Sequence, residues 1–84
     1  MSYGIEILRT AQKQLAQIAQ VDQARIVAAI LDLADVPRPV GCKKLSGRSG
    51  WRIRIGFYRV IYEIHDDKLL ILVVAVGHRR DIYR

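Results

Sequence analysis

The chain has 84 residues, 51% of them hydrophobic, and a formal net charge of +6 at pH 7. This length predicts a single domain over residues 1–84 with a small core, and the hydrophobic content excludes a disordered chain. A single cysteine, Cys42, excludes an intramolecular disulfide and fits a reducing compartment, so we expect a cytoplasmic protein. We expect no signal peptide, and the longest strongly apolar run, residues 69–76, is too short to span a membrane.

The positive charge lies entirely in the second half of the sequence. Residues 1–42 contain four basic and four acidic side chains, whereas residues 43–84 contain ten basic and four acidic ones. A concentration of cationic side chains on one part of a domain favours a polyanionic partner, either a nucleic acid or an acidic protein segment.

In chain order, residues 3–8 predict a short strand, and apolar residues then recur at helical spacing from residue 11 to about residue 20. Thr10 is the expected N-cap of this helix, and Asp22 is the expected cap of a second one. The short connection between the two helices predicts an α-hairpin.

The second helix is apolar over more than one face. One stripe, which we expect to pack on the sheet, consists of Val27, Ile30, Leu31 and Ala34. A second set widens it beyond what one packing face requires, namely Ile26, Ala29 and Leu33. We expect this second set to receive a partner helix.

Two prolines at residues 37 and 39 end the helical region, and a loop rich in Gly, Ser, Lys and Arg extends to residue 50. Such a loop either follows a phosphate backbone or is an ordinary solvated turn, and the residues alone leave both open. Residues 65–68 predict a tight turn, in which we expect His65 to be structural. Residues 69–76 are apolar on both faces, as is typical of a central strand.

Residues 51–62 predict a β-hairpin with two different faces. Apolar and cationic residues alternate over residues 51–55, which places Arg52 and Arg54 on the face opposite the apolar side chains. After a two-residue break the alternation resumes, with Arg59 on the polar face. Neighbouring guanidiniums repel each other, so an anion lying across them would stabilise the arrangement. The alternative is a solvated sheet face whose charges protect an edge.

The predicted fold is therefore α+β. An N-terminal strand precedes an α-hairpin of two helices, and a three-stranded antiparallel meander follows. The helices cover one face of the sheet, and the opposite face is basic and concave.

The sequence lacks a glycine-rich phosphate loop, a Ser-His-Asp order, a Cys/His cluster and a paired-carboxylate motif, so we expect neither a metal site nor a cofactor. The remaining candidates are cationic, and guanidiniums bind phosphate and stabilise its charged transition states. RNA carries its own nucleophile, the 2′-hydroxyl, whereas DNA does not. A basic site without a metal therefore favours RNA as the substrate.

The chain resembles the RelE/ParE superfamily of bacterial toxins, and its RelE side in particular. The resemblance covers essentially the whole chain, in its size, its order of elements and four motifs: Lys44-Leu45-Ser46-Gly47, Trp51-Arg52-Ile53-Arg54, Tyr58-Arg59-Val60-Ile61-Tyr62, and Val76-Gly77-His78-Arg79-Arg80-Asp81-Ile82-Tyr83-Arg84. It implies a ribosome-dependent endonuclease that cuts mRNA in the ribosomal A site, next to 16S rRNA. It also implies a cognate antitoxin that holds the toxin inactive in a hetero-oligomer, with no membrane involved.

The resemblance also implies the roles of individual residues. The family's two basic positions on the first meander strand fall on Arg52 and Arg54, and its phosphate-binding arginine falls on Arg59. The basic residue after the last strand's glycine falls on Arg79, and the base-stacking tyrosine falls on Tyr83. We assign further RNA contacts to four cationic residues: Lys43, Lys44, Arg48 and Arg80.

This sequence departs from well-studied RelE, which has lysines at the positions of Arg52 and Arg54. Arginine orients a phosphate but is a poor general base, because its guanidinium stays protonated. Proton abstraction then falls to His78, Tyr83 or Glu63, to a group of the ribosome or the mRNA, or to none of these. His78 is the first choice because its unperturbed pKa of ~6.5 suits the task, and the alternative is a polar residue at a strand exit.

Two other functions remain open. One is a ParE-like toxin that binds and poisons gyrase, although ParE-like chains generally lack the assembled basic set. The other is a non-catalytic interaction module that is basic because its partner is acidic.

Overall fold

The computed structural model describes residues 2–78 and has the α+β architecture predicted from the sequence. The elements, in chain order, are β1 (Gly4–Ile7), α1 (Arg9–Ala16), α2 (Gln20–Asp32), β2 (Lys43–Lys44), β3 (Trp51–Ile55), β4 (Tyr58–His65), a 3₁₀ turn (Asp66–Lys68) and β5 (Leu70–His78). The three predicted meander strands are present, and the short strand β2 adds to them.

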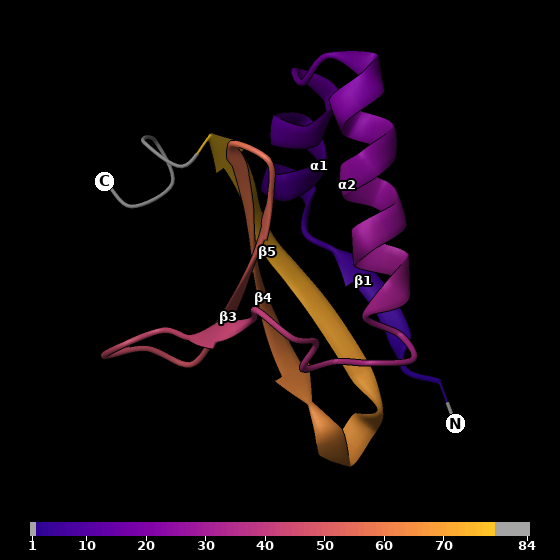
Figure 1. Ribbon diagram of the computed structural model, residues 1–84. Helices are drawn as coiled ribbons and strands as arrows, with labels where there is room; N and C mark the ends of the chain where they lie inside the picture. Colours follow the sequence, from indigo (N-terminus) through magenta and orange to yellow (C-terminus); the bar gives the residue numbers. More distant parts are fainter. Residues whose placement is uncertain (1, 79–84) are drawn as a thin grey trace.

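All five strands form one mixed sheet in the order β1-β5-β4-β3-β2. β5, β4, β3 and β2 pair antiparallel, whereas β1 pairs parallel to β5. Parallel neighbours need a crossover, and here the crossover contains both helices. As predicted, α1 and α2 cover one face of the sheet, which leaves the other face uncovered by helices (Figure 1). We call this other face the open face.

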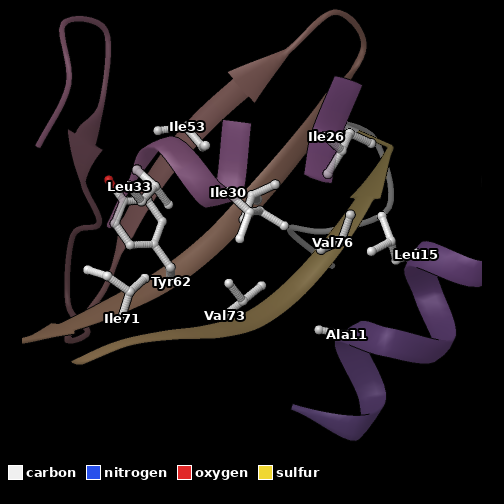
Figure 2. Packing of buried hydrophobic residues seen from close by; sticks show 11 residues of the cluster. Ala11, Leu15, Ile26, Ile30, Leu33, Ile53, Tyr62, Ile71, Val73 and Val76 are labelled. Carbon is white, nitrogen blue, oxygen red and sulfur yellow. The ribbon is translucent and has the colours of Figure 1, made fainter. Parts of the chain in front are cut away.

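The core lies between the helices and the sheet (Figure 2). Ile26 and Ile30 of α2 and Leu33, which directly follows α2, belong to the core and are at most 1% exposed. The prediction for this helix was therefore wrong in part. Ile30 packs in the core as expected, but Ile26 and Leu33 belong to the set that we expected to receive a partner. Leu31, expected in the core, is 58% exposed.

Both predicted helix caps are also wrong. α1 begins at Arg9 with Leu8 as its N-cap, so Thr10 lies within the first turn and forms no cap. α2 begins at Gln20 with Ala19 as its N-cap, and neither cap residue makes a side-chain hydrogen bond. Asp22 instead lies in the first turn of α2, where its negative charge interacts favourably with the helix dipole.

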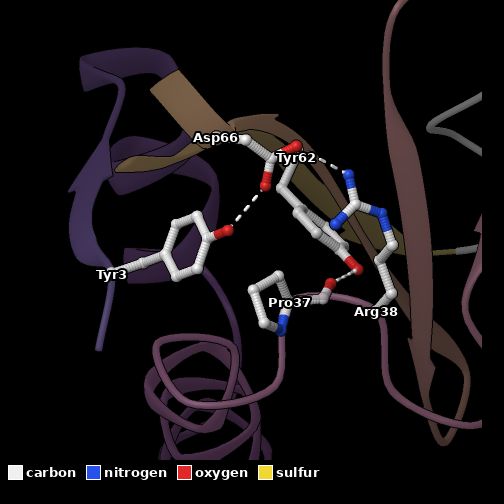
Figure 3. A network of polar contacts seen from close by, with 5 residues as sticks. All are labelled: Tyr3, Pro37, Arg38, Tyr62 and Asp66. Atoms are coloured by element: carbon white, nitrogen blue, oxygen red, sulfur yellow. Dashed lines mark hydrogen bonds and ion pairs between the residues drawn. The ribbon is translucent and has the colours of Figure 1, made fainter. Parts of the chain in front are cut away.

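Polar contacts attach the segment after α2 to the sheet (Figure 3). The Tyr62 hydroxyl donates a 2.7 Å hydrogen bond to the Pro37 carbonyl, and burial raises the pKa of this phenol well above its usual value. Arg38 forms a 3.0 Å ion pair with Asp66, and Tyr3 donates a 2.6 Å hydrogen bond to the same carboxylate. The Arg38 guanidinium also lies over the Trp51 ring at 5.1 Å. These contacts fix the path of the chain toward β2.

None of the helices in residues 2–78 is long and apolar enough to cross a membrane.

Candidate functional site

Cationic side chains gather on the open face because of the strand register. Arg54 of β3 is paired with Arg59 of β4, and Arg59 is in turn paired with Gly77 of β5. Paired residues of neighbouring strands share a face of the sheet, so the side chains of Arg54 and Arg59 leave the backbone next to each other on the same face. Like charges directly opposite each other are destabilising, and a bound anion would remove this cost.

A second row crosses the open face next to the first. It runs from Lys43 of β2 through Arg52 of β3 to Ile61 of β4 and Ala75 of β5. The two rows place four cationic side chains on three adjacent strands. The residues of β5 in these rows, Ala75 and Gly77, are small.

The three arginines differ in exposure, which the sequence did not predict. Arg54 is exposed and Arg59 is half-buried, whereas Arg52 is only 7% exposed. Among residues 2–78, no carboxylate lies within ion-pair distance of the Arg52 guanidinium. Burying a cation without a counter-charge is costly. Within the described part of the chain, a bound phosphate would give the Arg52 guanidinium the negative charge that no carboxylate there supplies.

The two other assigned cations in the described part of the chain lie apart from these rows. Lys44 is paired with Trp51, whose ring packs against the core, so this lysine starts on the opposite face from Arg52. Arg48 is exposed in the loop between β2 and β3. Thus Lys43 joins the arginines of the open face, whereas Lys44 does not.

His78 ends β5 on the helix-covered side of the sheet. It is paired with Tyr58, two residues from the core pair Val60 and Val76, and side chains two residues apart in a strand share a face. The Tyr58 and His78 rings meet edge to face at 6.0 Å, and the Phe57 ring is stacked on His78 at 6.2 Å. The side chains of His78 and Arg59 therefore extend from opposite faces of the sheet.

The two other polar candidates of β4 form a pair with each other. His65 Nε2 lies 2.9 Å from Glu63 Oε1, and both side chains are about one-third exposed. This contact agrees with the structural role expected for His65, and it engages the Glu63 carboxylate that was a candidate base. Within residues 2–78, no three His, Cys, Asp or Glu side chains lie close enough together to hold a metal ion.

The remaining assigned residues, Arg79, Arg80 and Tyr83, lie outside the described residues. Phe57, which the sequence reasoning passed over, is 69% exposed in the two-residue turn between β3 and β4. The signal was present in the sequence, because such turns usually contain glycine or a small polar residue, and an aromatic side chain is unusual there.

Comparisons with known proteins agree with the fold. The family model described as the ParE toxin of the type II toxin–antitoxin system parDE matches residues 5–83. The toxin RelG of Mycobacterium tuberculosis is 33% identical, and the alignment covers 100% of this chain and 99% of RelG. The mRNA interferase toxin RelE of Escherichia coli is 23% identical over 94% of this chain and 85% of its own length.

Among solved structures, the toxin–antitoxin complex RelBE2 of Mycobacterium tuberculosis contains a similar chain. The TM-score is 0.84 at 26% identity, and the match covers 94% of this chain and 100% of that one. The five-stranded sheet with its two helices is therefore a RelE-like fold.

Proposed function

The chain belongs to the RelE/ParE superfamily of toxins from toxin–antitoxin systems, and from this premise we propose that it is an endoribonuclease that cuts mRNA on the ribosome. It acts in the cytoplasm, where the ribosomes are. A cognate antitoxin protein neutralises it.

The cationic face formed by Lys43, Arg52, Arg54 and Arg59 is the observation that carries this proposal. Single-stranded RNA is held through its phosphates by arginine and lysine, and here these residues occupy adjacent strands of a rigid sheet. Arg54 and Arg59 clamp the phosphate at the cleavage position from two strands. Arg52 and Lys43 bind the neighbouring phosphate, and Arg48 contacts rRNA or mRNA at the rim.

The reaction needs three events at the phosphate. The 2′-oxygen attacks phosphorus, the bond from phosphorus to the 5′-oxygen breaks, and a proton moves from the 2′-hydroxyl to a base while the leaving oxygen gains one. The products are a 2′,3′-cyclic phosphate and a 5′-hydroxyl. Guanidiniums stabilise the negative charge that develops on the phosphoryl oxygens, which is commonly the largest contribution of a site of this kind.

A gyrase-poisoning toxin is the second candidate, and the description of the matching family model favours it. Two observations favour RNA cleavage instead. RelG and RelE align over nearly the whole chain, and the basic rows suit a phosphate backbone.

The test combines growth, translation and replication assays. Expression of this chain should stop protein synthesis, and primer extension on mRNA from a ribosome-containing translation reaction should show cuts only when ribosomes are present. Arg54→Ala should lower the cleavage rate by about 100-fold or more. The matched control is Arg9→Ala, which removes the same charge from an exposed position on α1 and should leave the rate unchanged.

Arrest of replication with intact mRNA would favour the gyrase poison. Equal effects of Arg54→Ala and Arg9→Ala would refute the assignment of the cationic face. The antitoxin is then sought as the product of the adjacent reading frame that restores growth on co-expression.

A further inference from the structure

The side of α2 that faces away from the sheet is apolar, and no helix or strand within residues 2–78 covers it (Figure 1). Val21 is 76% exposed and Leu31 is 58% exposed. Ala24 and Ala28 lie between them at helical spacing and are exposed as well. We call these four residues the outer stripe. Because the opposite side of α2 packs in the core, this helix is apolar on both sides, and such helices are usually buried on both sides.

The distribution of charge makes α2 the side on which two copies of this chain repel each other least. The net charge of +6 belongs to residues 43–84, whereas residues 1–42 contain equal numbers of acidic and basic side chains. α2 itself carries Asp22, Arg25 and Asp32. A second cationic copy can therefore approach this helix, while a polyanion is attracted to the other half of the chain.

Two exposed charges beside the outer stripe complement each other across a two-fold axis. Arg25 and Asp32 are seven residues apart, which is about two helical turns, so they flank the stripe on the same side. When two antiparallel helices are related by a two-fold axis, the same flank of each helix meets. Arg25 of each copy then lies beside Asp32 of the other, and the pair occurs twice.

Within one copy these two charges are weakly engaged. Arg25 makes a 3.7 Å ion pair with Asp22, and the Arg25 side chain is 61% exposed, so this contact contributes little. Asp32 has no ion-pair partner among the described residues. Both side chains are therefore available to a second copy.

The register that pairs these charges also packs the apolar side chains. It places Leu31 of one copy over Ala24 and Ala28 of the other, and these small residues allow the two helices to approach closely. α2 has 13 residues and is about 20 Å long, so the contact is smaller than a standard protein interface. We therefore expect a weak dimer, with a dissociation constant in the micromolar range.

We propose that a second copy of this chain docks on the outer stripe, with α2 packed antiparallel against α2 about a two-fold axis. The inference does not rest on the proposed function, because α2 lies on the opposite side of the sheet from the cationic side chains of the open face. Both open faces remain accessible in such a dimer, so RNA binding and self-association are compatible.

The first test is sedimentation equilibrium of the purified chain between about 10 μM and about 1 mM. The native chain should be in equilibrium between monomer and dimer. Leu31→Glu should weaken self-association by about tenfold or more, because its carboxylate loses hydration in the contact. The matched control is Val40→Glu, which introduces the same charge at a fully exposed valine outside α2 and should leave the equilibrium unchanged.

A charge exchange provides the second test, and it does not depend on how Leu31→Glu folds. Arg25→Asp and Asp32→Arg should each weaken self-association by about tenfold, since each replaces two attractive pairs with two repulsive ones. The chain with both substitutions again has opposite charges across the two-fold axis. It should self-associate within about threefold of the native chain.

Three results would overturn the proposal. They are a native chain that stays monomeric at about 1 mM, equal effects of Leu31→Glu and Val40→Glu, and a double variant that associates no better than its parents. A monomeric chain whose Leu31→Glu variant instead loses affinity for the growth-restoring protein would assign the outer stripe to that protein. Failure of the proposed function is distinguishable, because none of these measurements involves RNA.

Discussion

Replacing Tyr62 with phenylalanine removes the bond that holds the segment after α2 onto the sheet. The Tyr62 ring is fully buried, and its hydroxyl donates to the Pro37 carbonyl at 2.7 Å. The variant keeps the ring and its packing but leaves that carbonyl without its partner. Leaving a buried acceptor unpaired costs about 1–3 kcal/mol, and this bond is only partly buried, so we expect a loss of about 1–2 kcal/mol. For a domain of this size, each 1 kcal/mol lowers Tm by roughly 4–8 °C.

The assay is urea unfolding followed by the fluorescence of Trp51, the only tryptophan in the chain. Tyr58→Phe is the matched control, because Tyr58 lies in the same strand, is half-buried and makes no hydroxyl hydrogen bond among the described residues. It should change the free energy of unfolding by less than about 0.5 kcal/mol. A similarly small loss for Tyr62→Phe would refute the reasoning, because water would then replace the phenol without cost.

The pH dependence follows from the direction of the pKa shift. The pKa of Tyr62 is raised in the folded state, so its stabilising contribution is complete below the ordinary pKa of a tyrosine, about 10, and is lost as the pH rises through the folded value. The difference between the native protein and Tyr62→Phe should therefore stay constant from about pH 6 to about pH 9 and narrow only at more alkaline pH.

Three further outcomes are expected. In thermal unfolding, Leu33→Ala should cost about 2–5 kcal/mol, whereas Leu31→Ala should cost less than about 0.5 kcal/mol, because Leu33 is 1% exposed and Leu31 is 58% exposed. Hydrogen bonds from Arg38 and Tyr3 lower the pKa of Asp66, so Asp66→Asn should destabilise the fold at neutral pH, and in urea titrations the difference should vanish as the pH falls below about 4. Phe57→Ala should lower the RNA cleavage rate by about 5- to 150-fold and Phe57→Trp should retain it in the single-turnover assay, because the exposed Phe57 ring offers a surface on which a base stacks.

The hairpin and its two faces were predictable because they depend on local sequence. Alternation over residues 51–55 and the glycine at residue 56 determine the strands and the turn between them. Gly56 has a φ of 60°, which suits the first position of a two-residue hairpin turn. The pairing of Arg54 with Arg59 follows from this turn length.

The packing stripe of α2 was not predictable from periodicity alone. Apolar residues occupy most positions from Ile26 to Leu33, so two overlapping stripes fit the helical period. The stripe that faces the sheet depends on where the crossover places the helix, and that depends on the parallel pairing of β1 with β5. These two strands are about 65 residues apart in the chain. The burial of Arg52 is likewise a tertiary property that no local pattern encodes.

The structure bears most directly on the proton transfer, because it separates His78 from the arginines. From the sequence we expected His78 to follow a strand ending at Val76, and the sequence did not determine on which face of the sheet its side chain lies. The strand continues to His78, and the pairing with Tyr58 then assigns the imidazole to the helix-covered face. A base must lie within hydrogen-bond reach of the 2′-hydroxyl, directly or through one water.

We therefore expect catalysis to depend on charge stabilisation by the arginines more than on His78. His78→Gln should lower the cleavage rate by less than about tenfold, whereas Arg59→Gln should lower it by about 100-fold or more. Single-turnover cleavage on ribosomes measures both. The pH dependence of the cleavage rate should be the same in the native protein and in His78→Gln. A pH dependence that changes in His78→Gln, together with a loss of rate of more than about 100-fold, would contradict this expectation and identify His78 as the base.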